Sequence, residues 1–237
     1  MMFSKYFLIF NNLNSKFDLR LSIVKRPNIP STSKIKTTKQ IPGRDGLVYE
    51  EEGGYSDIVI SVEFNFIEKN NLKERFRQIK LWINEVQDNK LIFNDDPEWF
   101  YKVVDVKLNG DFETILRRKG KFRIDFTCRG YLYNLDADEF IEIHNNDNLY
   151  NYYLESKPQI YIQGNGEVKV SINNRKFTVP VQDYIYIDSE LELVFKTTDN
   201  YFNLGTGAFP KLNKGANLIQ FEGNIQVLKI KPRWRCL

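Results

Sequence analysis

One run of residues alternates between apolar and other side chains more cleanly than any other part of this chain. Its apolar members are Ile58, Ile60, Val62, Phe64 and Phe66. Successive side chains of a β-strand point to opposite faces, so a period of two predicts a strand with one buried face. A shorter run has the same pattern and predicts a second half-buried strand. It consists of Phe17, Leu19, Leu21 and Ile23.

Alanine is scarce, because the 237-residue chain contains only Ala137, Ala208 and Ala216. Alanine is the best helix former, so its scarcity favours β structure. An AT-rich genome has the same effect, since alanine codons are GC-rich, and a single sequence leaves both causes open. We expect a mainly β fold.

A single helix is predicted after the long alternating strand. Asn70 or Asn71 can cap its start. Apolar residues then recur at helical spacing and form one stripe. They are Leu72, Phe76, Ile79, Ile83 and Val86. The basic residues Lys73, Arg77 and Lys80 lie on the opposite side, so we expect a surface helix packed on a sheet. Residues 1–135 are therefore predicted to form an α+β domain.

The character of the chain changes near Leu135. Residues 136–155 carry six acidic side chains and no Lys or Arg. Short predicted strands with turn signals between them follow, which is typical of a β-sandwich. Residues 136–237 are therefore predicted to be a second, all-β domain. Its glycine-rich spots, Gly164–Gly166 and Gly205–Gly207, complete no phosphate-binding motif and are interpreted as turns.

Little in the sequence indicates catalysis. The single histidine, His144, lies in a polar stretch, and Cys128 and Cys236 are far apart, so no catalytic residue, metal or cofactor is expected. Carboxylates grouped in the sequence are the remaining candidates for acid–base chemistry. They are Asp95 with Asp96, Asp136 with Asp138 and Glu139, and Glu190 with Glu192. Asp95-Asp96-Pro97 is better explained as a turn.

No apolar stretch is long enough for a transmembrane helix, and the first ten residues lack the features of a secretory signal. Two thiols suit a reducing compartment, so we expect synthesis in a cytoplasm.

Aromatic residues accumulate among asparagines in the second predicted domain, a composition that suits sugar binding. They are Tyr150, Tyr152, Tyr153, Tyr161, Tyr184, Tyr186, Tyr201 and Trp234. Several of these alternate within predicted strands, so a position in the core remains equally open.

The net charge of +3 conceals segments of opposite sign. Residues 1–45 hold nine Lys/Arg against two Asp, a local charge of +7, and residues 46–68 hold six Asp/Glu and no Lys or Arg. Such segments are either complementary surfaces between copies of the chain or strands that neutralise each other within one copy. The residues alone favour the second interpretation. Residues 33–41 are polar on both faces, and Pro42–Gly46 predicts a tight turn, so this region is interpreted as a hairpin arm.

The order and spacing of many short motifs resemble the phage distal tail proteins of long-tailed phages that infect Gram-positive hosts. The motifs in the first part are Gly43-Arg44-Asp45-Gly46, Tyr55-Ser56-Asp57-Ile58, Leu81-Trp82, Leu91, Asp95-Asp96-Pro97, Phe100-Tyr101-Lys102, Gly120-Lys121-Phe122 and Phe126-Thr127-Cys128. Those in the second are Pro158, Gly164-Asn165-Gly166, Asp188-Ser189, Gly205, Phe209-Pro210, Leu212, Gly215, Asn217-Leu218-Ile219, Gly223 and Pro232-Arg233-Trp234-Arg235. Gly130 departs from the pattern, which has proline there.

The resemblance implies a structural protein of the virion tail tip, assembled in the cytoplasm of the bacterial host, without enzymatic activity of its own. It implies an N-terminal β-sandwich or barrel with one helix, followed by a galectin-like β-sandwich. Six N-terminal domains would form a ring that joins the tail tube protein to the tail-tip hub protein and leaves a channel for DNA. The C-terminal domains would project and carry receptor-binding parts.

A cyclic ring brings one face of a subunit against a different face of the next, which the segments of opposite charge suit. The candidate interface residues are Lys34, Lys36, Lys39, Arg44, Asp45, Glu50, Glu51 and Glu52. The alternative function is a carbohydrate-binding adhesin that recognises glycans of the host cell wall.

Overall fold

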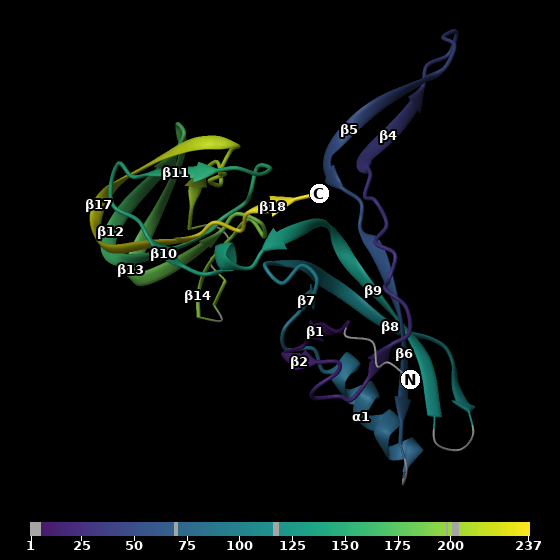
Figure 1. Cartoon of the computed structure of the whole chain (residues 1–237). Helices are drawn as coiled ribbons and strands as arrows, with labels where there is room; N and C mark the ends of the chain where they lie inside the picture. The colour runs from purple at the N-terminus through teal and green to yellow at the C-terminus, as the bar shows by residue number, and fades with distance from the viewer. Residues whose placement is uncertain (1–5, 69–70, 116–118, 198, 201–203) are drawn as a thin grey trace. The chain divides into compact units, whose positions relative to one another are not determined.

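The computed structural model describes the chain apart from residues 1–5, 69–70, 116–118, 198 and 201–203 (Figure 1). The described part consists mostly of β-strands with one α-helix, which confirms the predicted mainly β fold class. The chain forms two compact units, residues 1–132 with Leu237, and residues 133–236.

The first unit is built on an antiparallel sheet with the strand order β2-β1-β7-β8-β9-β6-β3, and β4 and β5 form a separate hairpin. Its elements are β1 (Leu8–Phe10), β2 (Leu13–Asn14), β3 (Ser22–Ile23), β4 (Lys34–Gln40), β5 (Leu47–Tyr55), β6 (Ile58–Ile67), α1 (Leu72–Asn84), β7 (Lys90–Phe93), β8 (Trp99–Ile115) and β9 (Lys119–Asn134).

Strand β6 lies where the clean alternation predicts it. Its five alternating apolar side chains are all buried, while those between them are exposed or half-buried. The second predicted strand is wrong in part. Only Ser22 and Ile23 form a strand there, and Phe17 is 68% exposed. The residues before β3 are turns in which Leu19 N donates to Asn14 O, so the backbone reverses although Leu19 and Leu21 remain buried.

Helix α1 begins after Asn71, whose side-chain oxygen accepts a hydrogen bond from Glu74 N, so the second of the two predicted caps is the one used. Its buried residues are Ile79, Trp82 and Ile83. Trp82 was absent from the predicted stripe, yet it anchors the helix, because its indole Nε1 donates to Phe10 O at 3.0 Å. Val86 lies beyond the helix and is 40% exposed.

Gly130, the departure from the family pattern, lies in β9 where other backbone comes close. A Cβ atom at this position would be 2.3 Å from Ser56 O and 2.5 Å from Thr32 Oγ1. Thr32 Oγ1 itself donates to Ser56 O at 2.8 Å. The small residue therefore lets this hydrogen-bonded segment lie directly against β9.

The second unit is an antiparallel sheet with the order β10-β17-β12-β13-β14-β15, in which β11 also pairs with β17 and β16 with β13. Its elements are a 3₁₀ turn η1 (Asp136–Asp138), β10 (Ile141–Glu142), β11 (Asn148–Asn151), β12 (Gln159–Ile172), β13 (Arg175–Asp188), β14 (Leu193–Lys196), β15 (Asp199–Asn200), β16 (Thr206–Gly207), β17 (Gly215–Lys231) and β18 (Arg235–Cys236). Asn173 and Asn174, both with positive φ, form the tight turn between β12 and β13.

The prediction that Gly164–Gly166 and Gly205–Gly207 are turns is wrong. Gly164–Gly166 lies in the middle of β12, where the register against β17 shifts. A Cβ at Gly164 would be 2.2 Å from Asn224 O, and Gly166 has a φ of +92°. These glycines therefore form an irregularity inside a long strand that curves around the core (Figure 1). Thr206 and Gly207 form β16, which pairs with Phe177 and Thr178.

A buried ion pair fastens the C-terminal segment of the second unit. Arg233 donates to both oxygens of Asp188 at 2.8 Å, and its Nη1 lies 3.5 Å from Glu190 Oε2. Burial opposes ionisation of Asp188, but the hydrogen bonds and the charge of Arg233 outweigh burial and lower its pKa. Ser156 Oγ also donates to Pro232 O, so the segment is held at two places.

Candidate assembly surface

The predicted ring-interface residues all lie on the hairpin formed by β4 and β5, which Figure 1 shows as a separate two-stranded ribbon. Its strands pair from Gln40 opposite Leu47 to Lys34 opposite Tyr55, with a register shift between Lys34 and Lys36. Gly53 and Gly54 lie at this shift with φ values of +80° and +88°. Their freedom to adopt positive φ accommodates the extra residues of β5.

The tip of the hairpin contains the predicted tight turn. Arg44 N donates to Ile41 O at 3.2 Å, and Gly43 and Gly46 have positive φ. Arg44 and Asp45 are both exposed here. The turn thus presents one charge of each sign to solvent.

The lysines of β4 and the glutamates of β5 pair within the chain. Lys34 Nζ lies 2.9 Å from Glu51 Oε2, and Lys36 Nζ lies 3.8 Å from Glu51 Oε1. Lys39 pairs with Glu50, on the opposite face of the hairpin, at 2.5 Å. The hydrogen bond from Lys34, together with its charge, lowers the pKa of Glu51, and the same contact raises the pKa of Lys34. The positive and negative segments therefore meet each other across one hairpin, the arrangement that the residues alone favoured.

All these charges are exposed, so their pairing is screened by water and salt and adds little to stability. Among the described residues, Glu52 on β5 and Arg44 and Asp45 at the tip take part in no ion pair. These three side chains are the candidates whose charge is not already balanced by a neighbour.

The sequence interpretation missed the apolar side chains of the hairpin. Ile35 is 41% exposed, Leu47 49% and Tyr49 63%. Leu47 and Tyr49 point to one face, and Ile35 to the other, because the strand periodicity is two. These apolar residues stand among charged residues in the sequence, so residues 33–41 are interpreted from the sequence as polar on both faces. A two-stranded hairpin with solvent on both faces is marginally stable, so these side chains mark a surface that suits a partner.

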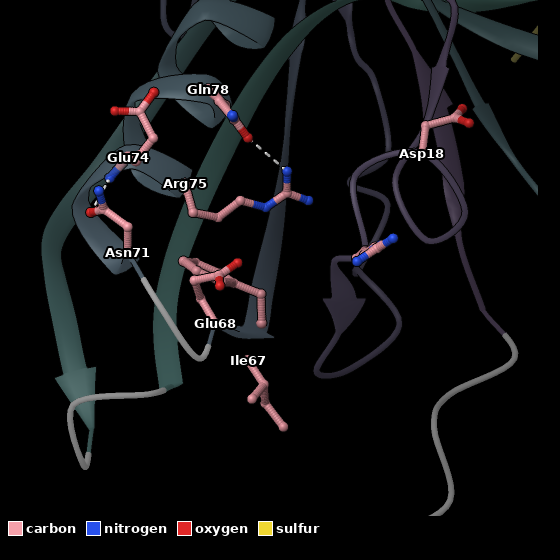
Figure 2. Close-up of a pocket in the computed structure, with 9 residues that line it drawn as sticks. Asp18, Ile67, Glu68, Asn71, Glu74, Arg75 and Gln78 are labelled. Carbon is pink, nitrogen blue, oxygen red and sulfur yellow. Dashed lines mark hydrogen bonds between the residues drawn. The ribbon is translucent and has the colours of Figure 1, made fainter.

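An open cleft of about 700 Å³ lies beside the start of α1 (Figure 2). It is lined by Asp18, Arg20, Phe66, Ile67, Glu68, Asn71, Glu74, Arg75 and Gln78. Arg75 is fixed by donating to Leu19 O and to Gln78 Oε1, and burial lowers its pKa. Charges of both signs line the cleft, so it offers polar contacts without a marked preference for anions or cations.

The side chains considered for chemistry are dispersed. Within the described residues, no three His, Cys, Asp or Glu side chains come together as a metal site. Burial raises the pKa of the Cys128 thiol to about 12, so that thiol is protonated and unreactive at neutral pH. His144 is exposed beside Asp147, with 3.6 Å between Nδ1 and Oδ2.

The grouped carboxylates have structural contacts. Asp95 lies 3.5 Å from Arg26, Asp96 N donates to Phe93 O in the predicted turn, and Glu192 lies 3.8 Å from Lys157. Asp136 and Asp138 belong to the 3₁₀ turn η1. In the described part of the chain, no helix is both long and apolar enough to span a membrane.

These features define a β-rich protein with an exposed two-stranded hairpin. Residues 12–128 match the family of the phage tail protein RIFT-related domain. Residues 12–128 are therefore similar to a domain of phage tail proteins, which agrees with the resemblance to distal tail proteins found in the sequence. No curated protein sequence matches the chain significantly.

Two solved structures share the fold over almost the whole chain. The first is the Dit protein of phage SPP1, described as a paradigm of the hub adsorption apparatus in phages that infect Gram-positive bacteria. It has 11% identity and a TM-score of 0.60, with 98% of this chain and 99% of that chain covered. The second is a chain of the phage P2 baseplate in its activated conformation with Ca, with 13% identity, a TM-score of 0.54, and coverage of 98% and 97%.

Proposed function

We propose that this protein is a structural component of a phage tail tip, in which six copies form a ring that joins the tail tube protein to the tail-tip hub protein. Residues 1–135 form the ring, and DNA passes through its channel without specific binding. Residues 136–237, a galectin-like domain, project from the ring.

The observation that carries the proposal is the hairpin. It exposes Ile35, Leu47 and Tyr49, although no other strand of the described residues pairs with β4 or β5. Packing against a neighbouring copy buries these side chains and supplies the contacts that an isolated hairpin lacks. The family match over residues 12–128 includes the whole hairpin and supports a role in the phage tail.

The contribution of the hairpin charges requires a mixing experiment, because they pair within each chain. One variant carries Lys34→Glu, Lys36→Glu and Lys39→Glu, and a second carries Glu50→Lys, Glu51→Lys and Glu52→Lys. Each variant alone places like charges opposite each other on the hairpin, so we expect it to form fewer rings than the wild type. A matched control reverses Lys73, Arg77 and Lys80, which are exposed on α1.

Light scattering coupled to size-exclusion chromatography then measures the mass of each sample. If charges meet between copies, an equimolar mixture of the two variants restores the hexamer. A chain that carries all six changes restores pairing within each copy. Rescue by that chain alone, with none in the mixture, means that the charges act only inside the hairpin. A wild-type chain that stays monomeric at every concentration contradicts the ring itself.

A further inference from the structure

Five aromatic rings gather on the outer face of the sheet in the second unit. They are Phe140, Tyr161, Tyr184, Tyr186 and Phe195, here called the aromatic row. Ile160 and Ile162 of β12, and Ile185 and Ile187 of β13, are buried in the core. The tyrosines alternate with these residues and therefore point away from the core. Each ring of the row is half-buried.

The row runs straight across the sheet. Tyr161 on β12 lies opposite Tyr186 on β13, and Tyr186 lies opposite Phe195 on β14. The ring centroids of Tyr161 and Tyr186 are 5.1 Å apart, as are those of Tyr186 and Phe195. The last two rings are stacked with an interplanar angle of 13°. Three adjacent strands thus carry a continuous row of apolar rings, in which Tyr186 and Phe195 each cover one face of the other.

Polar groups accompany the rings. The Tyr184 hydroxyl is 2.6 Å from Thr197 Oγ1, but among the described residues no hydrogen bond is made by the hydroxyl of Tyr161 or Tyr186. Gln163 lies opposite Tyr184 in the neighbouring register position. These hydroxyl and amide groups can donate and accept hydrogen bonds next to the apolar surface.

The charges around the row are balanced. Lys196 Nζ lies 3.7 Å from Asp183 Oδ2, and Lys231 Nζ lies 3.8 Å from Asp138 Oδ1. Lys229, the cross-strand neighbour of Tyr161 on β17, lies opposite Glu142 on β10. Each nearby lysine therefore has a carboxylate beside it, and no net charge is available to select an anionic polymer.

We propose that the aromatic row is a binding site for an uncharged glycan. The C–H faces of a sugar ring carry partial positive charge and stack on aromatic faces, while its hydroxyls pair with tyrosine and glutamine groups. Lys196 Nζ lies 4.6 Å from the ring centroid of Tyr184, and Lys231 Nζ lies 5.1 Å from that of Phe140. Among the described residues, the rings of the row without a lysine over them are therefore Tyr161, Tyr186 and Phe195. This binding activity is additional to the structural role proposed above.

The test uses the full-length protein and three neutral probes, maltohexaose, cellohexaose and chitohexaose, with a heparin hexasaccharide as the anionic comparison. Titration calorimetry measures affinity, and NMR amide shifts on the wild-type protein locate the contact. We expect at least one neutral probe to bind, with shifts confined to β12, β13 and β14. Because the wild-type protein supplies the map, the result does not depend on any variant folding.

Tyr186→Leu is expected to weaken binding about tenfold, since it removes a flat face while keeping an apolar side chain. Tyr186→Phe retains the face and most of the affinity. Leu191→Ala is the control, because Leu191 is 61% exposed in the same unit but outside the row, and the affinity of this variant should equal that of the wild type.

Three results overturn the proposal. They are no binding of any neutral probe, binding of heparin alone, and amide shifts outside the row. A fourth is self-association that Tyr186→Leu abolishes, which would make a second copy the occupant. If the protein forms a hexamer but binds no neutral glycan, the glycan proposal fails and the ring proposal does not.

Discussion

The ion pair between Arg233 and Asp188 should make a measurable contribution to the stability of the second unit. The Asp188 side chain is 2% exposed and that of Arg233 is 15% exposed, so the pair lies mostly away from water. Arg233→Met leaves a buried carboxylate without its cation. Breaking a buried pair in this way costs about 3–5 kcal/mol. Asp188 retains hydrogen bonds from Glu190 N and Leu191 N, so we expect a loss near the lower end, about 3 kcal/mol.

Hydrogen–deuterium exchange read by mass spectrometry is the appropriate assay, because it resolves the two units in one sample. A loss of about 3 kcal/mol lowers the protection of β12 and β13 by about two powers of ten. Peptides from β6, in the first unit, are the internal control and should be unchanged. The double variant Asp188→Asn with Arg233→Met removes both charges and should recover much of the loss.

The same pair makes the stability of the second unit depend on pH. The hydrogen bonds and the charge of Arg233 lower the pKa of Asp188 in the folded state despite the burial of Asp188. The ion pair therefore contributes its full stabilisation above the unfolded pKa of about 3.9. The contribution is lost as pH falls through the folded pKa, in the range below about pH 4. In that range, the difference in protection between the wild type and Arg233→Met should therefore be smaller than at neutral pH. Wild-type protection of β12 and β13 in Arg233→Met would refute the reasoning.

Two further predictions concern the first unit. Gly130→Ala places a Cβ against Ser56 O and should destabilise this unit by about 1–3 kcal/mol. Hydrogen exchange in β6 measures the effect. Gly46→Ala is the control, because a Cβ at the open hairpin tip meets no atom and should change that exchange less. In the native protein, iodoacetamide should leave Cys128 unmodified up to pH 9 because burial raises its pKa to about 12, and modification of Cys128 as fast as that of half-buried Cys236 would contradict this assignment.

The sequence predicted the elements whose signals are local and repeated. Strand β6 and helix α1 follow from side-chain periodicity, because burial on one face demands that periodicity. Periodicity failed around Phe17, where turn hydrogen bonds reverse the chain although the apolar spacing remains. It also failed at Gly164, because close approach by Asn224 is a long-range contact that no neighbouring residue reveals.

The charged segments show why the sequence alone did not predict how the charges of the candidate site pair. The sequence contains a basic stretch and an acidic stretch, but the register across Gly53 and Gly54 determines that Lys34 and Lys36 both lie near Glu51. Once these charges are paired in one chain, they contribute less to attraction between copies. In the proposed ring, the apolar side chains of Ile35, Leu47 and Tyr49 would then contribute more to assembly, since burying apolar area is favourable at any ionic strength. A ring held mainly by these side chains should therefore persist at high salt, and one held mainly by Lys–Glu contacts should dissociate.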